Sequence, residues 1–195
     1  MRSLRTLTMI VAGMVVIDAL WTPIILLWAK TLPELFHTVI TPVAGVVDGS
    51  ALCFKIATMI LFGRWIYVAG DNLIEADVSD LEFTPGSRIW WFAVPIASLF
   101  KPFQGMRELW NASHEVWPHN ASQGLVAIWW ALWLLSSFLG SITGIAGGSP
   151  GSSLPILLAS SAVDIVLAVV AIMLIRGIAV AQERLGGAAL SEVFA

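Results

Sequence analysis

Four long apolar runs constrain this chain more than any other feature of its sequence. They cover residues 7–29, 51–70, 125–146 and 154–175, and charged residues are scarce within them. A helix needs about 20 apolar residues to cross a bilayer, because it rises about 1.5 Å per residue through a hydrocarbon core of about 30 Å. The runs therefore predict four transmembrane helices. The expected fold class is all-α, a polytopic membrane helix bundle forming a single domain over residues 1–195.

The composition agrees with a membrane protein. Hydrophobic residues make up 58% of the chain and charged residues only 12%, whereas soluble domains carry about 25% charged residues. The net charge of −3 leaves no basic surface for nucleic acid, so we expect membrane lipids as partners instead. Tryptophan is enriched at membrane interfaces. We therefore assign Trp129, Trp130 and Trp133, at the start of the third run, to an interfacial girdle.

A shorter apolar segment lies between the second and third spans. Residues 89–100 are uncharged and are flanked by Arg88 and Lys101. Segments of about 10–14 apolar residues are more often re-entrant or interfacial than spanning. Pro95 removes a helical hydrogen bond in the middle of the run, and Pro102 follows the lysine. We predict an embedded segment over about 89–101 that re-enters or lies in the interface without crossing.

The regions next to these runs receive assignments of their own. The spacing of Phe103, Met106 and Trp110 predicts an amphipathic helix over about 102–117, suited to lying in the interface. Residues 31–50 contain two prolines and two glycines and predict a loop. The acidic residues 71–86 predict a solvated loop, and residues 177–195 a short polar-ended tail.

The central stretch resembles the signature of a bacterial membrane family known as domain of unknown function 4328 (DUF4328). The resemblance rests on an Asn-Leu pair, a Pro-Gly pair, a Trp/Phe-rich run with Pro-x-Ala-x-Leu, a Lys-Pro pair and a Glu-x-Trp. These motifs fall on Asn72, Leu73, Pro85, Gly86, Trp91, Phe92, Pro95, Ala97, Leu99, Lys101, Pro102, Glu108 and Trp110. The match covers roughly residues 60–135 closely. It implies the membrane architecture and supplies no catalytic residue, since the family has no established activity.

The distribution of basic residues predicts the orientation, because Lys and Arg gather on the cytoplasmic side of inner-membrane proteins. If the embedded segment does not cross, eight basic residues lie inside and only Lys30 and Lys55 outside. If it crosses, the ratio becomes four against six. We therefore expect a multi-pass protein of the bacterial inner membrane with both termini in the cytoplasm.

Four charged residues form a candidate intramembrane cluster. Asp18 and Asp164 lie near the midpoints of their spans, Arg64 lies about one turn from the midpoint of its own, and Lys101 closes the embedded segment. A charge at that depth costs at least about 2.5–3.5 kcal/mol, so each should find a partner. We expect an ion pair of Arg64 with Asp18 or Asp164, and prefer that interpretation to a proton or ion path.

A stripe of small residues marks one face of the third span. Ser136, Gly140, Gly144 and Gly148 recur every four residues, a spacing that lets another helix approach closely. The face formed by Ser136, Gly140 and Gly144 is a candidate contact with other membrane proteins or with a second copy.

The sequence offers no catalytic, metal-binding or cofactor-binding constellation. His114 and His119 lack the four-residue spacing of a zinc-binding helix, and Pro118 lies between them. We therefore expect no enzyme and no cofactor. The preferred function is a non-enzymatic membrane scaffold or regulatory module, and the alternative is a small transporter or channel with its site at the broken embedded segment.

Overall fold

The computed structural model describes residues 2–145 and 154–193, and this part of the chain contains helices and no strand. In chain order the elements are α1 Arg5–Thr31, α2 Pro33–Val39, η1 Thr41–Val43, α3 Ala44–Glu75, α4 Pro85–Trp90, η2 Ala97–Leu99, α5 Lys101–Ser113, α6 Gly124–Ile145 and α7 Leu154–Val193. The helices α1, α6, α7 and the helical stretch ending with α3 are long and apolar enough to cross a membrane. The prediction of an all-α bundle with four such helices is confirmed.

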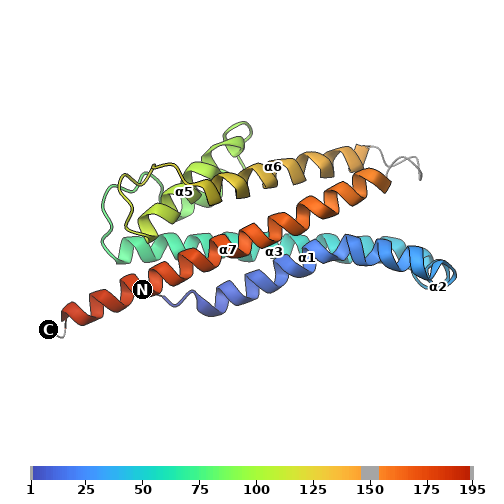
Figure 1. Ribbon diagram of the computed structural model, residues 1–195, viewed down its shortest axis with the longest axis horizontal. Helices are drawn as coiled ribbons and strands as arrows, with labels where there is room; N and C mark the ends of the chain where they lie inside the picture. Colours follow the sequence, from blue (N-terminus) through green and yellow to red (C-terminus); the bar gives the residue numbers. More distant parts are fainter. Residues whose placement is uncertain (1, 146–153, 194–195) are drawn as a thin grey trace.

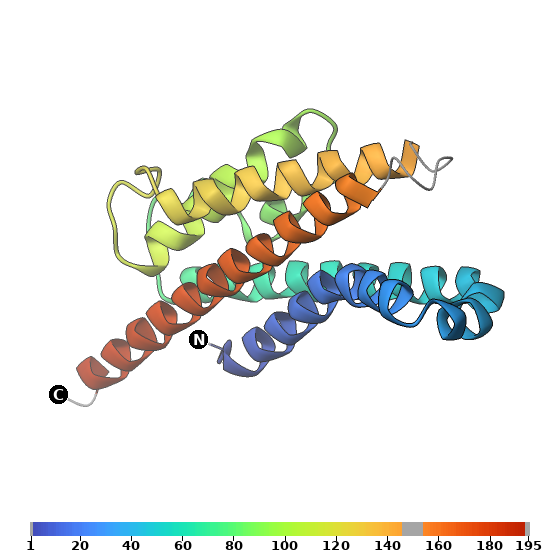
Figure 2. The same cartoon turned by 45° about the vertical axis from the view of Figure 1, so that its right-hand side comes forward.

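Helix α7 holds the bundle together. It packs against both α1 and α6, while α1 also packs against α3. Figures 1 and 2 show α7 running obliquely between the α1–α3 pair and α6. The short helices α4 and α5 fill the space between α3, α6 and α7 at the end of the bundle where α3 finishes.

Most of the core lies at this end of the bundle. Trp65, Leu73, Leu109, Leu174 and Ile178 are at most 2% exposed and belong to one cluster. The long helices instead expose large apolar side chains over much of their surface, for example Leu27, Met59, Phe138 and Val169. A chain with such a surface is suited to lipid rather than to water.

Three assignments made from sequence are corrected by the structure. Residues 31–50 are largely helical, because Pro33 occupies the first turn of α2, where its missing N–H costs nothing. Helix α7 continues past residue 175 to Val193, because apolar residues such as Ile178 still pack on the core after Arg176. The predicted helix over 102–117 starts one residue earlier and already ends at Ser113.

The assignment of the tryptophans at the start of α6 to an interfacial girdle is also corrected. Trp129 and Trp130 are only 3% and 6% exposed. Trp129 stacks on Phe62 of α3, with ring centroids 6.3 Å apart, and Trp130 stacks on Trp133 at 4.7 Å. They are core residues, because Phe62 of α3 packs on Trp129 and Phe92 of the apolar segment 89–100 packs on Trp130.

Candidate functional site

A buried ion pair joins α4 and α5, the helices on either side of the broken apolar segment. Nη2 of Arg88, on α4, donates to Oε1 of Glu108, on α5, over 2.6 Å, and the two side chains are 1% and 7% exposed. The Glu108 carboxylate also accepts the backbone N–H groups of Glu82 and Phe83 at 2.6 and 3.1 Å. Burial lowers the pKa of Arg88 from its ordinary value, and Glu108 opposes that shift.

Two glycines make room for the arginine. A Cβ at Gly70 of α3 would lie 2.6 Å from Nη1 of Arg88, and one at Gly105 of α5 would lie 3.3 Å from its Cγ. Pro85 packs on the same glycine of α3, with its Cα 3.3 Å from that Cβ position. Helices α3 and α5 therefore form a slot in which the guanidinium lies against bare backbone.

The slot satisfies the arginine only in part. Nε and Nη1 of Arg88 are buried and have no hydrogen-bond partner among residues 2–145 and 154–193. Buried polar groups without partners are costly. Glu108 is consequently the main compensation that the described chain offers to this charge.

A second polar network lies next to the pair and ties four segments together. Asn72 of α3 exchanges two hydrogen bonds with the backbone of Arg2 and donates to Oε1 of Gln182 on α7. Gln182 in turn donates to the carbonyl of Ala69 at 2.8 Å and to the hydroxyl of Ser113 on α5 at 3.0 Å. These side chains are all buried, so the N-terminal segment, α3, α5 and α7 have one mutual arrangement at this end.

The apolar segment over residues 89–100 is broken and folds back on itself. Helix α4 ends at Trp90, and Ile96 has φ 67°, in the left-handed region, before the short η2 turn. Phe92 packs edge-on against Trp130 and Trp133, at 6.2 and 6.0 Å, and the Trp130 indole donates to the carbonyl of Leu99. The segment therefore runs along α6 without forming a helix long enough to span.

Both ends of the segment come back to the same place. Nζ of Lys101 lies 3.2 Å from a carboxylate oxygen of Glu82 and 5.2 Å from the centre of the Phe83 ring. Glu82 precedes α4 and Lys101 begins α5, so residues 83–100 form a closed hairpin.

The family-motif positions mostly build this end of the bundle. Asn72, Pro85, Pro102 and Glu108 are buried, and Trp91 is half-buried. Trp110 lies against Gly177 of α7, where an added Cβ would come 2.6 Å from its ring. Gly86 and Pro95 are exposed.

The predicted intramembrane charges do not meet as expected. Asp164 accepts a hydrogen bond from the Ser136 hydroxyl over 2.5 Å. Lys101 pairs with Glu82, and Arg64 is exposed and has no ion pair within the described ranges 2–145 and 154–193. The expected pairing of Arg64 with Asp18 or Asp164 is therefore not formed.

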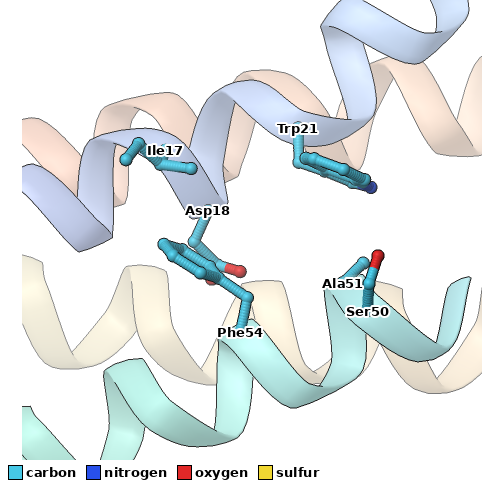
Figure 3. A pocket seen from close by; sticks show the side chains of 6 residues that line it. All are labelled: Ile17, Asp18, Trp21, Ser50, Ala51 and Phe54. Atoms are coloured by element: carbon cyan, nitrogen blue, oxygen red, sulfur yellow. The ribbon is translucent and has the colours of Figure 1, made fainter. Parts of the chain in front are cut away.

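Asp18 lies beside a cavity between α1 and α3. The cavity has a volume of about 200 Å³ and is lined by Ile17, Asp18, Trp21, Ser50, Ala51 and Phe54. Figure 3 shows the Asp18 side chain projecting from α1 toward α3, beside Phe54. Lys55 and Asp164 are the charged groups that act on it electrostatically. The cavity is thus formed by α1 and α3 and not by the broken segment.

Three polar residues at the end of the bundle where α3 finishes were not identified from the sequence. Arg88 was assigned only as a charge that flanks the apolar segment, and neither Gln182 nor Ser113 was assigned a bonding role. The only signal for Arg88 was its position beside the Pro85-Gly86 turn and twenty residues before the motif glutamate. Gln182 carried no such signal, because its partners on α3 and α5 come from distant parts of the chain.

Comparison with known proteins identifies a family without assigning a function. Neither the curated proteins nor the solved structures contain a match to this chain. A family model described as "Domain of unknown function (DUF4328)" matches residues 39–180. That range includes α3 and α6, both partners of the buried ion pair, and all the motif positions from Asn72 to Trp110. The chain belongs to the DUF4328 family.

Proposed function

We propose that the chain is a multi-pass protein of the bacterial inner membrane with both termini in the cytoplasm. In this proposal residues 89–101 enter the bilayer from the cytoplasmic side and return to it. The support is the contact of Lys101 with Glu82 at the two ends of the hairpin, together with the Arg88–Glu108 pair. Irregular backbone at membrane depth is tolerated where protein satisfies it, and here Phe92 packs on Trp130 of α6 while the Leu99 carbonyl accepts a hydrogen bond from the same indole.

The proposed role is a non-enzymatic scaffold or regulatory module for other membrane proteins. One observation carries it: the polar side chains at the family-motif positions are used to hold the chain's own helices together. Glu108 bonds Arg88 and two backbone groups, and Asn72 bonds Arg2 and Gln182. Motif side chains that bond within the chain itself support a structural role for the protein.

Reporter fusions test the topology. A reporter at residue 80, one at residue 120 and one at the C-terminus should all report a cytoplasmic location. An outside signal at 120 combined with an inside signal at 80 would mean that the embedded segment crosses, and would overturn the proposal.

Native electrophoresis of mildly solubilised membranes tests the scaffold role. We expect the wild-type chain to migrate in a defined complex with another membrane protein. An Arg88→Met variant, in which the hairpin is released, should leave that complex. Gly13→Ala, where the added Cβ meets no atom within 4 Å, is the matched control and should stay in it. A wild-type chain that migrates alone after cross-linking in intact membranes would contradict the role.

A small transporter is the second candidate, favoured by the cavity that Asp18 lines and by the nearby Asp164 and Lys55. Ionisable residues within spans often mark ion or proton pathways. In proteoliposomes a transporter would carry an ion or proton flux that Asp18→Asn abolishes. The scaffold proposal expects the flux of empty vesicles for both the wild type and the variant.

A further inference from the structure

Asp18 is an acid without a partner at the midpoint of α1, a helix apolar enough to span a membrane. Its side chain is half-buried and has no hydrogen bond or ion pair among residues 2–145 and 154–193. A carboxylate at such a depth is costly unless another group compensates its charge. The described part of the chain therefore leaves this carboxylate available to a ligand.

The charged groups around Asp18 sum to a net negative charge. Asp164 of α7 and Lys55 of α3 are the two that act on it electrostatically. Lys55 is exposed and does not come within ion-pair distance of either acid. Two carboxylates and one ammonium group leave one negative charge over, so a ligand that enters here should be a cation.

Two aromatic rings and a hydroxyl group complete the cavity beside Asp18. Trp21 lies three residues after Asp18 on the same face of α1, and Phe54 lines the cavity from α3. Figure 3 shows the Ser50 hydroxyl group pointing from α3 toward α1. This hydroxyl donates its hydrogen to the carbonyl of Val47 over 2.8 Å, which leaves its oxygen free to accept a hydrogen bond from a ligand. A carboxylate, a hydroxyl oxygen and aromatic rings are all groups that attract a cation.

The size and the opening of the cavity restrict the ligand further. Its volume of about 200 Å³ is below the range of about 300–1,000 Å³ that holds drug-sized ligands, so the bound group is small. Ile17 and Trp21 are 51% and 39% exposed, so the cavity opens on the surface of the α1–α3 pair. The neighbouring Leu20 and Leu52 are exposed and apolar. A ligand that arrives over such a surface needs an apolar part of its own.

We propose that the cavity beside Asp18 binds an alkylammonium ion. The ammonium group would donate charge-assisted hydrogen bonds to the Asp18 carboxylate and a further one to the Ser50 oxygen. The alkyl chain would lie against Trp21 and Phe54, and the nearby rings would add cation–π attraction. The inference rests on the cavity of the second candidate function, and it requires neither transport nor the scaffold role.

Isothermal titration calorimetry of the purified full chain in detergent tests the inference. The probes are n-butylammonium and the neutral n-pentanol, which has the same length, and empty micelles give the background. We expect the wild type to bind n-butylammonium and to prefer it clearly to n-pentanol. Asp18→Asn should bind n-butylammonium about tenfold more weakly, because it loses the charge-assisted bond. Asp48→Asn is the matched control, since it removes an exposed acid of α3 that does not line the cavity.

A second variant tests the place of binding without changing any charge. Ala51 lines the cavity with a small side chain, so Ala51→Leu should fill the space and weaken the binding of n-butylammonium. Melting temperatures without probe check that each variant folds. n-Butylammonium should raise the melting temperature of the wild type and of Asp48→Asn, because a ligand that binds the folded state stabilises it, and should not raise that of Asp18→Asn or Ala51→Leu.

Three results would overturn the inference. They are equal binding of the two probes by the wild type, undiminished binding in both Asp18→Asn and Ala51→Leu, and an equal loss of binding in Asp48→Asn. Flux measurements in proteoliposomes separate this inference from the transporter candidate. Binding that depends on Asp18 without any flux supports the inference and contradicts the transporter, whereas a proton flux without binding of n-butylammonium contradicts the inference alone.

Discussion

The Nη2 nitrogen of Arg88 lies 2.6 Å from Oε1 of Glu108, although the two residues are 20 positions apart in the chain, with the broken apolar segment between them. Neither side chain is more than a tenth exposed. Because water cannot reach the pair, removing one partner leaves the other charge buried and uncompensated. The contact closes the hairpin. Its loss should destabilise the end of the bundle where α3 finishes and where the Asn72 network lies.

Substitution of one partner should therefore destabilise the chain strongly. Arg88→Met or Glu108→Gln alone should lower the free energy of unfolding by about 3–5 kcal/mol, the usual cost of breaking a buried pair. The double variant should lose less than the sum, because no unpaired charge remains. Chemical unfolding in detergent measures all three, and additive losses would show that the two side chains act independently.

The exposed pair of Lys101 and Glu82 is the matched control. The side chains are 28% and 67% exposed, so solvent screens their attraction. Lys101→Met and Glu82→Gln should each change the free energy of unfolding by no more than about 1 kcal/mol.

Gly70 should not tolerate a side chain. Its added Cβ would lie 2.6 Å from Nη1 of Arg88 and 3.3 Å from the backbone of Pro85, which cannot move aside easily. We expect Gly70→Ala to lower the melting temperature. Gly13→Ala on α1 meets open space and should leave the temperature unchanged or raise it, because alanine favours helix over glycine. Equal melting temperatures for both variants would mean that the slot around Arg88 has room for a Cβ at Gly70, and would contradict this prediction.

Asn72 should hold the N-terminal segment in place. Asn72→Ala removes both hydrogen bonds to the Arg2 backbone and leaves Oε1 of Gln182 without its donor. The expected cost is about 1–3 kcal/mol, typical of a buried group left unsatisfied. A protease site placed before Arg2 should be cut faster in this variant than in the wild type. Unchanged cleavage would contradict the bond to Arg2, and Asn120→Ala, at an exposed position, is the control.

Gly140 of the small stripe on α6 should matter between molecules more than within one, although Ser136 of the same stripe donates to Asp164 of α7. A Cβ at Gly140 meets no heavy atom within 4 Å, whereas Gly144 and Gly148 lie outside the described side chains. Gly140→Leu should therefore keep the melting temperature of the dilute chain. If the face contacts a second copy, cross-linking in membranes should fall. A large drop in melting temperature would instead mean that the stripe packs inside the bundle.

Arg64 and Asp164 should act independently. No ion pair joins them, and Asp164 accepts its hydrogen bond from Ser136. The losses of stability in Arg64→Leu and Asp164→Leu should add in the double variant, as they do for sites without a shared partner. Rescue of one substitution by the other would restore the ion pair expected from sequence.

The sequence by itself determined the class of the molecule. The four apolar runs lie within α1, α3, α6 and α7 apart from the last residue of the third, which is outside the described residues. Length and hydropathy suffice for this result, because a helix satisfies its backbone hydrogen bonds within one segment and needs no information from elsewhere. The same reasoning separated the short run 89–100 from the spanning helices.

Only the tertiary structure decided which polar residues matter. Arg64 and Arg88 are both arginines next to apolar sequence, yet one is exposed and the other is 2% exposed in a slot between Gly70 and Gly105. The buried depth of Trp129 and the role of Gln182 likewise depend on segments distant in the chain. A local pattern records how apolar a segment is, whereas the partner of a charge depends on which helices pack beside it. That choice is made by the assembled bundle as a whole.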